Sequence, residues 1–142
     1  MLDRILYYID DDSDDLTTFM YAAKELAINV RLFKSGRNVL EELEQGHQKP
    51  FAILVDLNMP IMNGFQIIQN IVDNHNILKI PVIAFSTASD EDSIEKAKEA
   101  GATCYISKPT SIGQIKKILR FVSDNDWQAF DRNKNFLPRV KS

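Results

Sequence analysis

The sequence contains a single cysteine, Cys104, and no long apolar run among its 142 residues. One cysteine cannot form an intrachain disulfide or assemble a cysteine metal site, which fits a reducing compartment. No segment approaches the ~18 consecutive apolar residues of a membrane span, and the N-terminus lacks a basic stretch followed by a long apolar one. We therefore expect a cytoplasmic protein with no membrane partner.

The sequence also lacks an excess of positive charge. Lys and Arg number 17 against 20 Asp and Glu, which gives a net charge of −3. This balance offers no electrostatic footprint for nucleic acid or for an anionic membrane. With 44% apolar and 26% charged residues, the chain is typical of a globular protein, and its length suits one domain with one core.

Short apolar runs alternate with helical patterns along the chain. The runs are residues 5–9, 30–33, 51–55, 81–85 and 103–106. They are too short for typical buried helices, and several are rich in the Ile, Val, Phe and Tyr of buried strands. Between them apolar residues recur at the helical period, as Leu16, Phe19 and Ala23 do. The alternation predicts a parallel sheet with helices on both faces.

Polar residues stand where the predicted strands end. Asp10, Asp11 and Asp56 follow two of the strands, and Ser86 and Lys108 follow two others. Ligands of such sheets bind beyond the carboxyl ends of the strands. Crowded carboxylates repel one another unless a cation is present, and Mg²⁺ prefers oxygen ligands. Because Lys108 would suit a phosphoryl oxygen and Ser86 could donate to an anion, the set indicates an acyl-phosphate site with Asp56 as nucleophile.

Each residue type at this edge also has a purely structural interpretation. Asp is common at helix N-termini, and we expect Asp14 and Asp15 to serve only the dipole of the first helix. Ser86 and Thr87 are typical turn formers, and a lone lysine on a loop is usually solvent-exposed. Only the combination of carboxylates, hydroxyl and lysine has a chemical meaning.

Four segments, "YIDDD", "ILVDLNMPIMNG", "VIAFST" and "GATCYISKP", together resemble the receiver domain of two-component response regulators. The likeness covers roughly residues 3–123. It implies an α/β, flavodoxin-like fold of five βα units with strand order 2-1-3-4-5. It further implies a receiver domain over residues 1–123 and a C-terminal extension over residues 124–142, with no output domain.

The resemblance implies a role for each acidic residue. Asp56 corresponds to the phosphoacceptor of the family. Asp11 would bind Mg²⁺ directly together with Asp56, and Asp10 would act mainly through water. The backbone carbonyl of Asn58 would complete the protein ligands of the metal.

The resemblance also implies a switch. Ser86 matches the switch hydroxyl, and Thr87 matches a small residue whose N–H lies near the phosphoryl group. Lys108 matches the lysine of the family site, and Lys108–Pro109 matches a peptide bond that is often cis. Tyr105 matches the aromatic residue that fills the space left when the switch hydroxyl moves.

On this likeness the chain accepts a phosphoryl group on Asp56 from a histidine kinase or phosphotransfer protein. It would then signal to a downstream protein through the face of the fourth helix, fifth strand and fifth helix. It would be a phosphoacceptor with self-catalysed transfer and slow autodephosphorylation rather than an enzyme.

Three alternatives remain beside this interpretation. A haloacid dehalogenase-type phosphatase would need a general acid where Asn58 stands. A flavin-binding domain would need a phosphate cradle, and the loop after the first strand is acidic instead. The third is a receiver that acts as a phosphorylation-independent binding module.

The C-terminal extension is rich in aromatic residues. Trp127 and Phe130 are three apart and can continue the apolar stripe of the fifth helix for about two more turns. The aromatics either fold back over the domain or complete a dimer interface beside that helix, and we favour a symmetric homodimer. Such extensions resemble those of stand-alone receivers that serve phytochrome-type kinases.

Overall fold

The computed structural model describes residues 4–46, 48–59, 62–74 and 79–140. Five strands and five helices alternate along these ranges. The strands are β1 (Ile5–Ile9), β2 (Asn29–Phe33), β3 (Ala52–Asp56), β4 (Val82–Ser86) and β5 (Cys104–Ser107). The helices are α1 (Ser13–Glu25), α2 (Gly36–Gln45), α3 (Gly64–Asn74), α4 (Glu91–Ala100) and α5 (Ile112–Asp124).

The strands form one parallel sheet in the order β2-β1-β3-β4-β5, so the predicted flavodoxin-like fold is confirmed. Strand bounds match the predicted runs to within one residue. The shift matters at two places, because Asp56 and Ser86 are the last residues of β3 and β4 rather than the first residues beyond them. The register pairs Ile9 with Val55 and therefore brings the carboxyl ends of β1 and β3 together.

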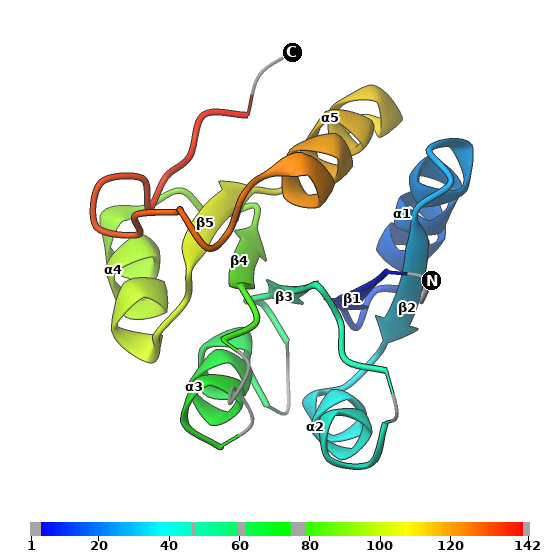
Figure 1. Ribbon diagram of the computed structural model, residues 1–142. Helices are drawn as coiled ribbons and strands as arrows, with labels where there is room; N and C mark the ends of the chain where they lie inside the picture. The colour runs from blue at the N-terminus through cyan, green and yellow to red at the C-terminus, as the bar shows by residue number, and fades with distance from the viewer. Residues whose placement is uncertain (1–3, 47, 60–61, 75–78, 141–142) are drawn as a thin grey trace.

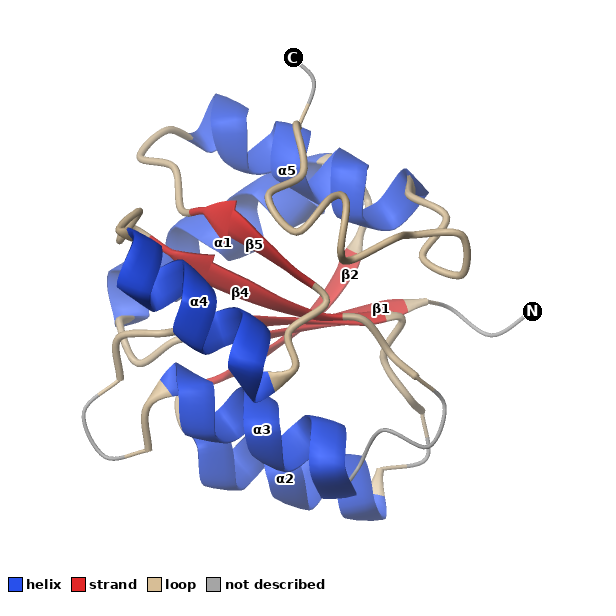
Figure 2. Ribbon diagram, turned by 90° about the vertical axis from the view of Figure 1, so that its left-hand side faces the viewer, coloured by secondary structure: helices blue, strands red, loops and turns tan. Residues whose placement is uncertain are grey.

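Helices cover both faces of the sheet: α1 and α5 lie on one face, and α2, α3 and α4 lie on the other (Figures 1 and 2). Successive residues of a strand point to opposite faces. Tyr7 accordingly packs with the layer of α2 to α4, and Tyr8 packs with the layer of α1 and α5. Strands buried on both sides explain the uninterrupted apolar runs of the sequence.

Local sequence signals set the ends of the helices. The Asp12 side chain is the N-cap of α1 and accepts hydrogen bonds from the N–H groups of Asp14 and Asp15. Helix α4 ends at Gly101, which has a φ of 104° and the left-handed conformation that glycine adopts without a steric penalty. Among the described residues no helix has the length and hydropathy of a membrane span.

The predicted continuation of α5 through Trp127 and Phe130 is wrong, because the helix ends at Asp124. The carboxylate of Asp126 accepts hydrogen bonds from two following N–H groups and forms a turn that competes with the helix. The indole N–H of Trp127 donates to the carbonyl of Val122 at 2.9 Å, a carbonyl that a longer helix would have used itself.

After α5 the chain crosses β5 and reaches α4 (Figures 1 and 2). The rings of Phe121, Trp127 and Phe130 pack in series, with centroids 5.9 Å and 4.9 Å apart, beside α5. Phe136 is buried in the other layer, with α4. The tail aromatics thus pack within the chain, whereas the homodimer and the domain division stay predictions.

We expect Gly64→Ala to destabilise the protein by about 1–3 kcal/mol, because an added methyl group overpacks a backbone contact. A Cβ at Gly64 would lie 2.4 Å from the carbonyl oxygen of Asp56 and 2.5 Å from the Cα of Leu57. Urea denaturation measures the change. The matched control is Gly113→Ala, whose Cβ would meet nothing within 4 Å, and we expect it to leave stability unchanged or slightly higher. Equal stability of the two variants would contradict the close contact at Gly64.

Candidate functional site

Three carboxylates meet at the carboxyl ends of β1 and β3. Each of Asp10, Asp11 and Asp56 has an oxygen within 4.8 Å of an oxygen of the other two. Asp10 and Asp56 are buried, whereas Asp11 is exposed. Two buried carboxylates in contact are costly unless hydrogen bonds or a cation compensate them.

Asp10 has a full set of hydrogen-bond partners. Its Oδ1 accepts the N–H of Asp12 at 2.9 Å. Its Oδ2 accepts the hydroxyl of Tyr8 and the ammonium of Lys108, each at 2.5 Å. The charge of Asp10 is therefore compensated inside the protein.

Asp56 is compensated less well. Burial raises the pKa of Asp56 to about 7, and the charge of Asp10 and a hydrogen bond with it act in the same direction. The charge of Lys108 and the N–H of Asn58, 3.3 Å from Oδ1, lower this pKa only in part. The site therefore favours any additional positive charge that approaches Asp56.

Lys108 joins the sheet edge to helix α1. Its Nζ donates to Asp10 and also to Oδ2 of Asp15, the latter at 2.7 Å. Burial lowers the pKa of Lys108, but the hydrogen bonds to the two carboxylates outweigh this effect and the net shift is upward. The prediction that Asp15 serves only the helix dipole is wrong. Asp15 is in the first turn of α1, whereas Asp11 precedes the Asp12 cap, so no helical spacing relates the two and only the fold reveals this contact.

Tyr8 is a second residue that the sequence analysis missed. Its side chain is 1% exposed and packs against Phe19 and Phe85, as an ordinary core residue would. Burial and the hydrogen bond to Asp10 raise the pKa of Tyr8 far above its usual range, so its hydroxyl remains a donor. Tyr8 is two residues before Asp10, and the two-residue period of a strand could have placed both on one face.

Ser86, at the end of β4, is buried next to this cluster, whereas Thr87 is exposed. The Oγ of Ser86 accepts the N–H of Ala88 at 3.1 Å, and the hydroxyl of Tyr105 donates to the carbonyl of Ala88 at 2.5 Å. Burial raises the pKa of Tyr105, and a hydrogen bond with Ser86 offsets part of that rise. Ser86 is thus linked to β5 through Ala88 and Tyr105, and its carbonyl accepts the N–H of Lys108.

The resemblance implies two features of the loops at this edge: the isomer of the Lys108–Pro109 bond and a metal ligand in the loop after β3. No peptide bond among the described residues is cis, so Lys108–Pro109, which the resemblance matches to a bond that is often cis, is trans. The trans isomer is the one favoured by about 0.5–1 kcal/mol before proline. Asn58 is exposed beside Asp56, and Pro60 and Ile61 of the same loop lie outside the described residues.

The donor set at the strand ends suits a hard divalent cation. All three side chains offer carboxylate oxygens, and two of them are held rigidly by strands and backbone hydrogen bonds. The raised pKa of Asp56 shows that one lysine does not neutralise the cluster. Oxygen ligands in this number are the pattern that Mg²⁺ and Mn²⁺ prefer over softer metals.

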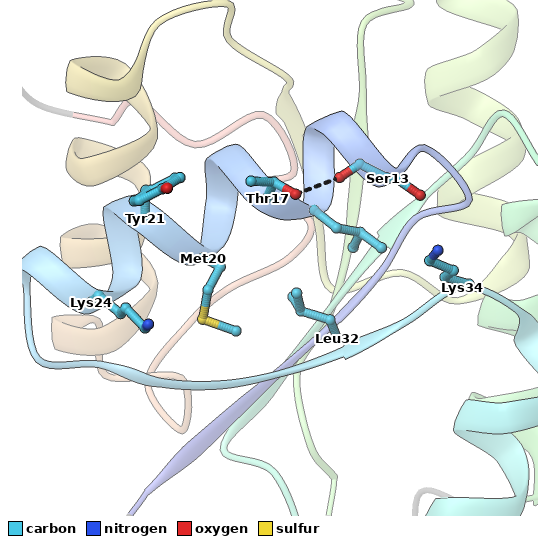
Figure 3. Close-up of a pocket in the computed structure, with 8 residues that line it drawn as sticks. Ser13, Thr17, Met20, Tyr21, Lys24, Leu32 and Lys34 are labelled. Atoms are coloured by element: carbon cyan, nitrogen blue, oxygen red, sulfur yellow. Dashed lines mark hydrogen bonds between the residues drawn. The ribbon is translucent and has the colours of Figure 1, made fainter.

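A separate groove of about 430 Å³ lies between α1 and β2. In Figure 3, Met20 of α1 and Leu32 of β2 point into it, and Lys24 and Lys34 stand toward its two ends. Its lining includes no carboxylate, so the groove is chemically distinct from the acidic cluster. Tyr21, also on its rim, is 62% exposed.

Comparison with known sequences gives consistent matches. The sequence model described as "Response regulator receiver domain" matches residues 6–120. The sensor histidine kinase CheAY of Helicobacter pylori is 33% identical over 109 residues, which are 77% of this chain and 14% of that protein. The DNA-binding transcriptional regulator NtrC of Escherichia coli is 31% identical over 130 residues, 91% of this chain and 27% of that protein. The chain thus spans about a quarter or less of the length of these curated relatives.

Solved structures show the same fold. The phosphorylated cyanobacterial phytochrome response regulator RcpA superimposes with a TM-score of 0.76 at 24% identity, covering 87% of this chain and 96% of that one. The Mn²⁺-bound form of response regulator Rcp1 also gives a TM-score of 0.76, at 21% identity and with the same coverage. At this level of identity the likeness supports the fold alone.

Asp56 should give the metal-free protein a measurable pH dependence. Its native pKa of about 7 exceeds the ~4 of an unfolded aspartate, so the native state binds more protons between these values. Stability contributed by this proton is complete below about pH 4 and is lost as pH rises through 7. In a chelator, wild type should therefore lose thermal stability relative to Asp56→Asn between about pH 5 and pH 8.

The matched control is Asp73→Asn, an exposed position on α3 away from the cluster, whose melting temperatures should run parallel to those of wild type. Parallel curves for wild type and Asp56→Asn as well would contradict the raised pKa of Asp56.

Proposed function

The chain belongs to the response regulator receiver domain family, and on that premise we propose that Asp56 accepts a phosphoryl group from a histidine kinase or phosphotransfer protein. Receiver domains are generally phosphoacceptors rather than enzymes, and they interact with histidine kinases and downstream effectors. The observation that carries the proposal is the position of Asp56: it is buried at the end of β3 and faces Asp10, and among the described residues no ammonium or guanidinium pairs with it directly.

The proposed reaction is a displacement at phosphorus. A carboxylate oxygen of Asp56 attacks the phosphoryl group of phosphohistidine, the P–N bond breaks, and the imidazole leaves with that electron pair. Such transfer proceeds through a loose transition state, which positioning and positive charge stabilise. Asp56 supplies the positioning, because β3 pairs with both β1 and β4 and holds the carboxylate fixed.

We propose Mg²⁺ as the cation of this site. Asp11, Asp56 and the backbone carbonyl of Asn58 would hold it directly, and Asp10 mainly through water. When bound, the ion supplies positive charge that offsets the carboxylates and the phosphoryl oxygens. The cluster of three carboxylates supports the assignment, as does the Mn²⁺-bound form of Rcp1 among the structures that share this fold.

Lys108 would provide the second positive charge. Its backbone N–H donates to the carbonyl of Ser86 at 2.8 Å, which fixes its Cα beside the ends of β4 and β5. Its ammonium is held by the buried Asp10 and by Asp15, which is partly exposed, and we propose that it gives up Asp15 when it bonds a phosphoryl oxygen on Asp56. Asp15 would thereby act as the resting partner of Lys108.

The signal would leave the site through Ser86 and Thr87. The Ser86 hydroxyl would donate to the phosphoryl group, and the N–H of Thr87 would approach it. Tyr105 is 2% exposed and bonded to Ala88 without any phosphoryl group, so the rearrangement would begin from an inward Tyr105. The output would be read by a downstream protein on the face formed by α4, β5 and α5.

A cytoplasmic location and a homodimer on the α4–β5–α5 face remain parts of the proposal. Asn58 has no acidic proton to give a leaving group, which disfavours the phosphatase alternative. A receiver that binds partners without phosphorylation would share the fold and differ only in lacking the transfer to Asp56.

We expect acetyl phosphate with Mg²⁺ to add one phosphoryl group to wild type and none to Asp56→Asn. The reason is that Asp56 is the buried carboxylate next to Asp10 that lacks a direct ammonium partner. Intact mass spectrometry measures the product, and a chelator should abolish it. Asp73→Asn is the matched control and should label as wild type does. Full labelling of Asp56→Asn would refute the assignment, and an unlabelled wild type would favour the binding module.

Lys108 and Asp15 should affect the labelling rate in different ways. Lys108→Gln removes a charge-assisted contact to the transferred group and should slow labelling by about tenfold or more. Asp15→Asn removes a competing partner of that lysine and should leave the rate within about threefold or increase it. Lys34→Gln, on the rim of the separate groove, is the control. Equal slowing by Asp15→Asn and Lys108→Gln would contradict the resting role of Asp15.

A further inference from the structure

The C-terminal strap, which we define as residues 131–138, lies outside the range that matches the receiver family. It runs beside β5 and α4, where Figures 1 and 2 show the chain returning from the end of α5 across the sheet edge. Neither the acidic cluster nor the proposed switch requires it. Its contacts therefore call for a separate explanation.

The strap closes the exposed edge of the sheet. Strand β5 pairs with β4 on one side only, which leaves a row of outward backbone groups on its other side. The outward N–H of Tyr105 donates to the carbonyl of Phe136 at 2.7 Å. The strap thus takes the place that an added extended segment would take.

Arg132 anchors the strap to α4. Its guanidinium donates to the carbonyl of Lys98 at 2.8 Å and to the carbonyl of Ala102 at 2.9 Å and 3.1 Å. Lys98 is in the last turn of α4, whose carbonyls carry the partial negative charge of the helix, and its carbonyl also accepts the N–H of Gly101. Ala102 follows the Gly101 cap. Arg132 therefore acts as a C-terminal cap supplied by a distant part of the sequence.

Phe136 anchors the strap to the core. It is 7% exposed and belongs to the same buried cluster as Ala97, Ala102 and Tyr105. The guanidinium carbon of Arg132 lies 5.7 Å from the centre of its ring. The next residue, Leu137, is 59% exposed, so a single side chain of this pair fills the site.

Beside these anchors a hollow of about 550 Å³ remains on the same face, between β5, α5 and the tail. Its lining includes Tyr105, Lys108, Ile118, Leu137 and Pro138. Without the strap, this face would present the N–H of Tyr105, the carbonyls of Lys98 and Ala102 without the guanidinium that binds them, and an apolar socket for one aromatic ring. These are the features that bind an extended peptide through its backbone and one side chain.

We propose that the strap is an internal ligand of the α4–β5 edge, and that a downstream partner binds there by inserting an extended segment with an arginine and, four residues later, an aromatic residue. The strap and the partner segment compete for the same groups. The chemistry of the partner is inferred from Arg132, which binds the carbonyls of Lys98 and Ala102, and from Phe136, which fills the apolar socket.

Release of the strap rests on the proposed function of Asp56. Tyr105 donates its N–H to the strap and its hydroxyl to the carbonyl of Ala88, whose own N–H donates to Ser86. If the hydroxyl of Ser86 turns toward a phosphoryl group on Asp56, these bonds around Ala88 are disturbed. Tyr105 then becomes more mobile, and the hydrogen bond from its N–H to the carbonyl of Phe136 weakens.

Hydrogen exchange of the Tyr105 amide, measured by NMR on the full chain, reports strap docking directly. Phe136→Ala and Arg132→Gln should each speed this exchange by about tenfold or more. The matched controls are Lys134→Gln and Arg139→Gln at exposed positions of the same tail, which should leave it unchanged. The amide of Leu54 in the central strand β3 should stay protected throughout and shows that the variants fold. Equal Tyr105 exchange in anchor and control variants would overturn the proposal.

A synthetic peptide of residues 129–140 tests competition. Added to the Phe136→Ala chain, it should restore protection of the Tyr105 amide, whereas the same peptide carrying Phe136→Ala should not. Failure of both peptides would overturn the docking site. Tyr105 protection that falls on dilution of wild type would also overturn the internal ligand, because the strap would then come from a second copy.

Beryllofluoride with Mg²⁺, a phosphoryl mimic, tests the release. Exchange at Tyr105 should rise in wild type and stay unchanged in Asp56→Asn. An adduct that forms on Asp56 without changing Tyr105 exchange would overturn the release step. Absence of any adduct would instead overturn the phosphoacceptor function, while the anchor variants and the peptide would still decide the docking site.

Discussion

Two buried carboxylates, only one of which bonds the ammonium of Lys108, determine the chemistry of this protein. Asp10 and Asp56 meet because β1 and β3 are adjacent and pair Ile9 with Val55, and both side chains are buried. Lys108 bonds Asp10, which Tyr8 and a backbone N–H also satisfy, and leaves Asp56 with less compensation. The pKa of Asp56 rises to about 7 for this reason. An uncompensated, rigidly held carboxylate is what both a divalent cation and a phosphoryl donor require.

The structure also provides a path from this charge to the surface. Ser86 ends β4 beside the cluster, Ala88 follows it, and Tyr105 contacts Ala88 from the neighbouring strand. These contacts are part-buried hydrogen bonds that meet at Ala88, so a change at Ser86 is expected to affect Tyr105. The strap lies at the far end of the path and covers the edge of β5. The proposed phosphoryl transfer and the proposed binding edge are therefore connected through three residues.

Much of the fold could be predicted because buried parallel strands leave a clear pattern. The apolar runs gave all five strands to within one residue, and the polar residues at their ends marked the edge where Asp10, Asp11 and Asp56 meet. Contacts that depend on tertiary structure were missed, because nothing local shows that Asp15 holds Lys108. The strand period places Tyr8 and Asp10 on one face but does not show that the hydroxyl of Tyr8 reaches Asp10. The end of α5 was misjudged because the spacing of Trp127 and Phe130 suits a helix, while Asp126 and the indole N–H form a turn instead. Apolar periodicity indicates which residues are buried, but it does not determine whether the backbone that carries them is helical.

Structure determination of the full chain with Mg²⁺ and beryllofluoride would show which side chain binds the phosphoryl mimic and where Lys108 lies. We expect an adduct on the carboxylate of Asp56, with the ammonium of Lys108 moved from Asp15 to the adduct. An adduct on another side chain would contradict the assignment of Asp56. An adduct on Asp56 with Lys108 still paired to both Asp10 and Asp15 would contradict the resting role of Asp15.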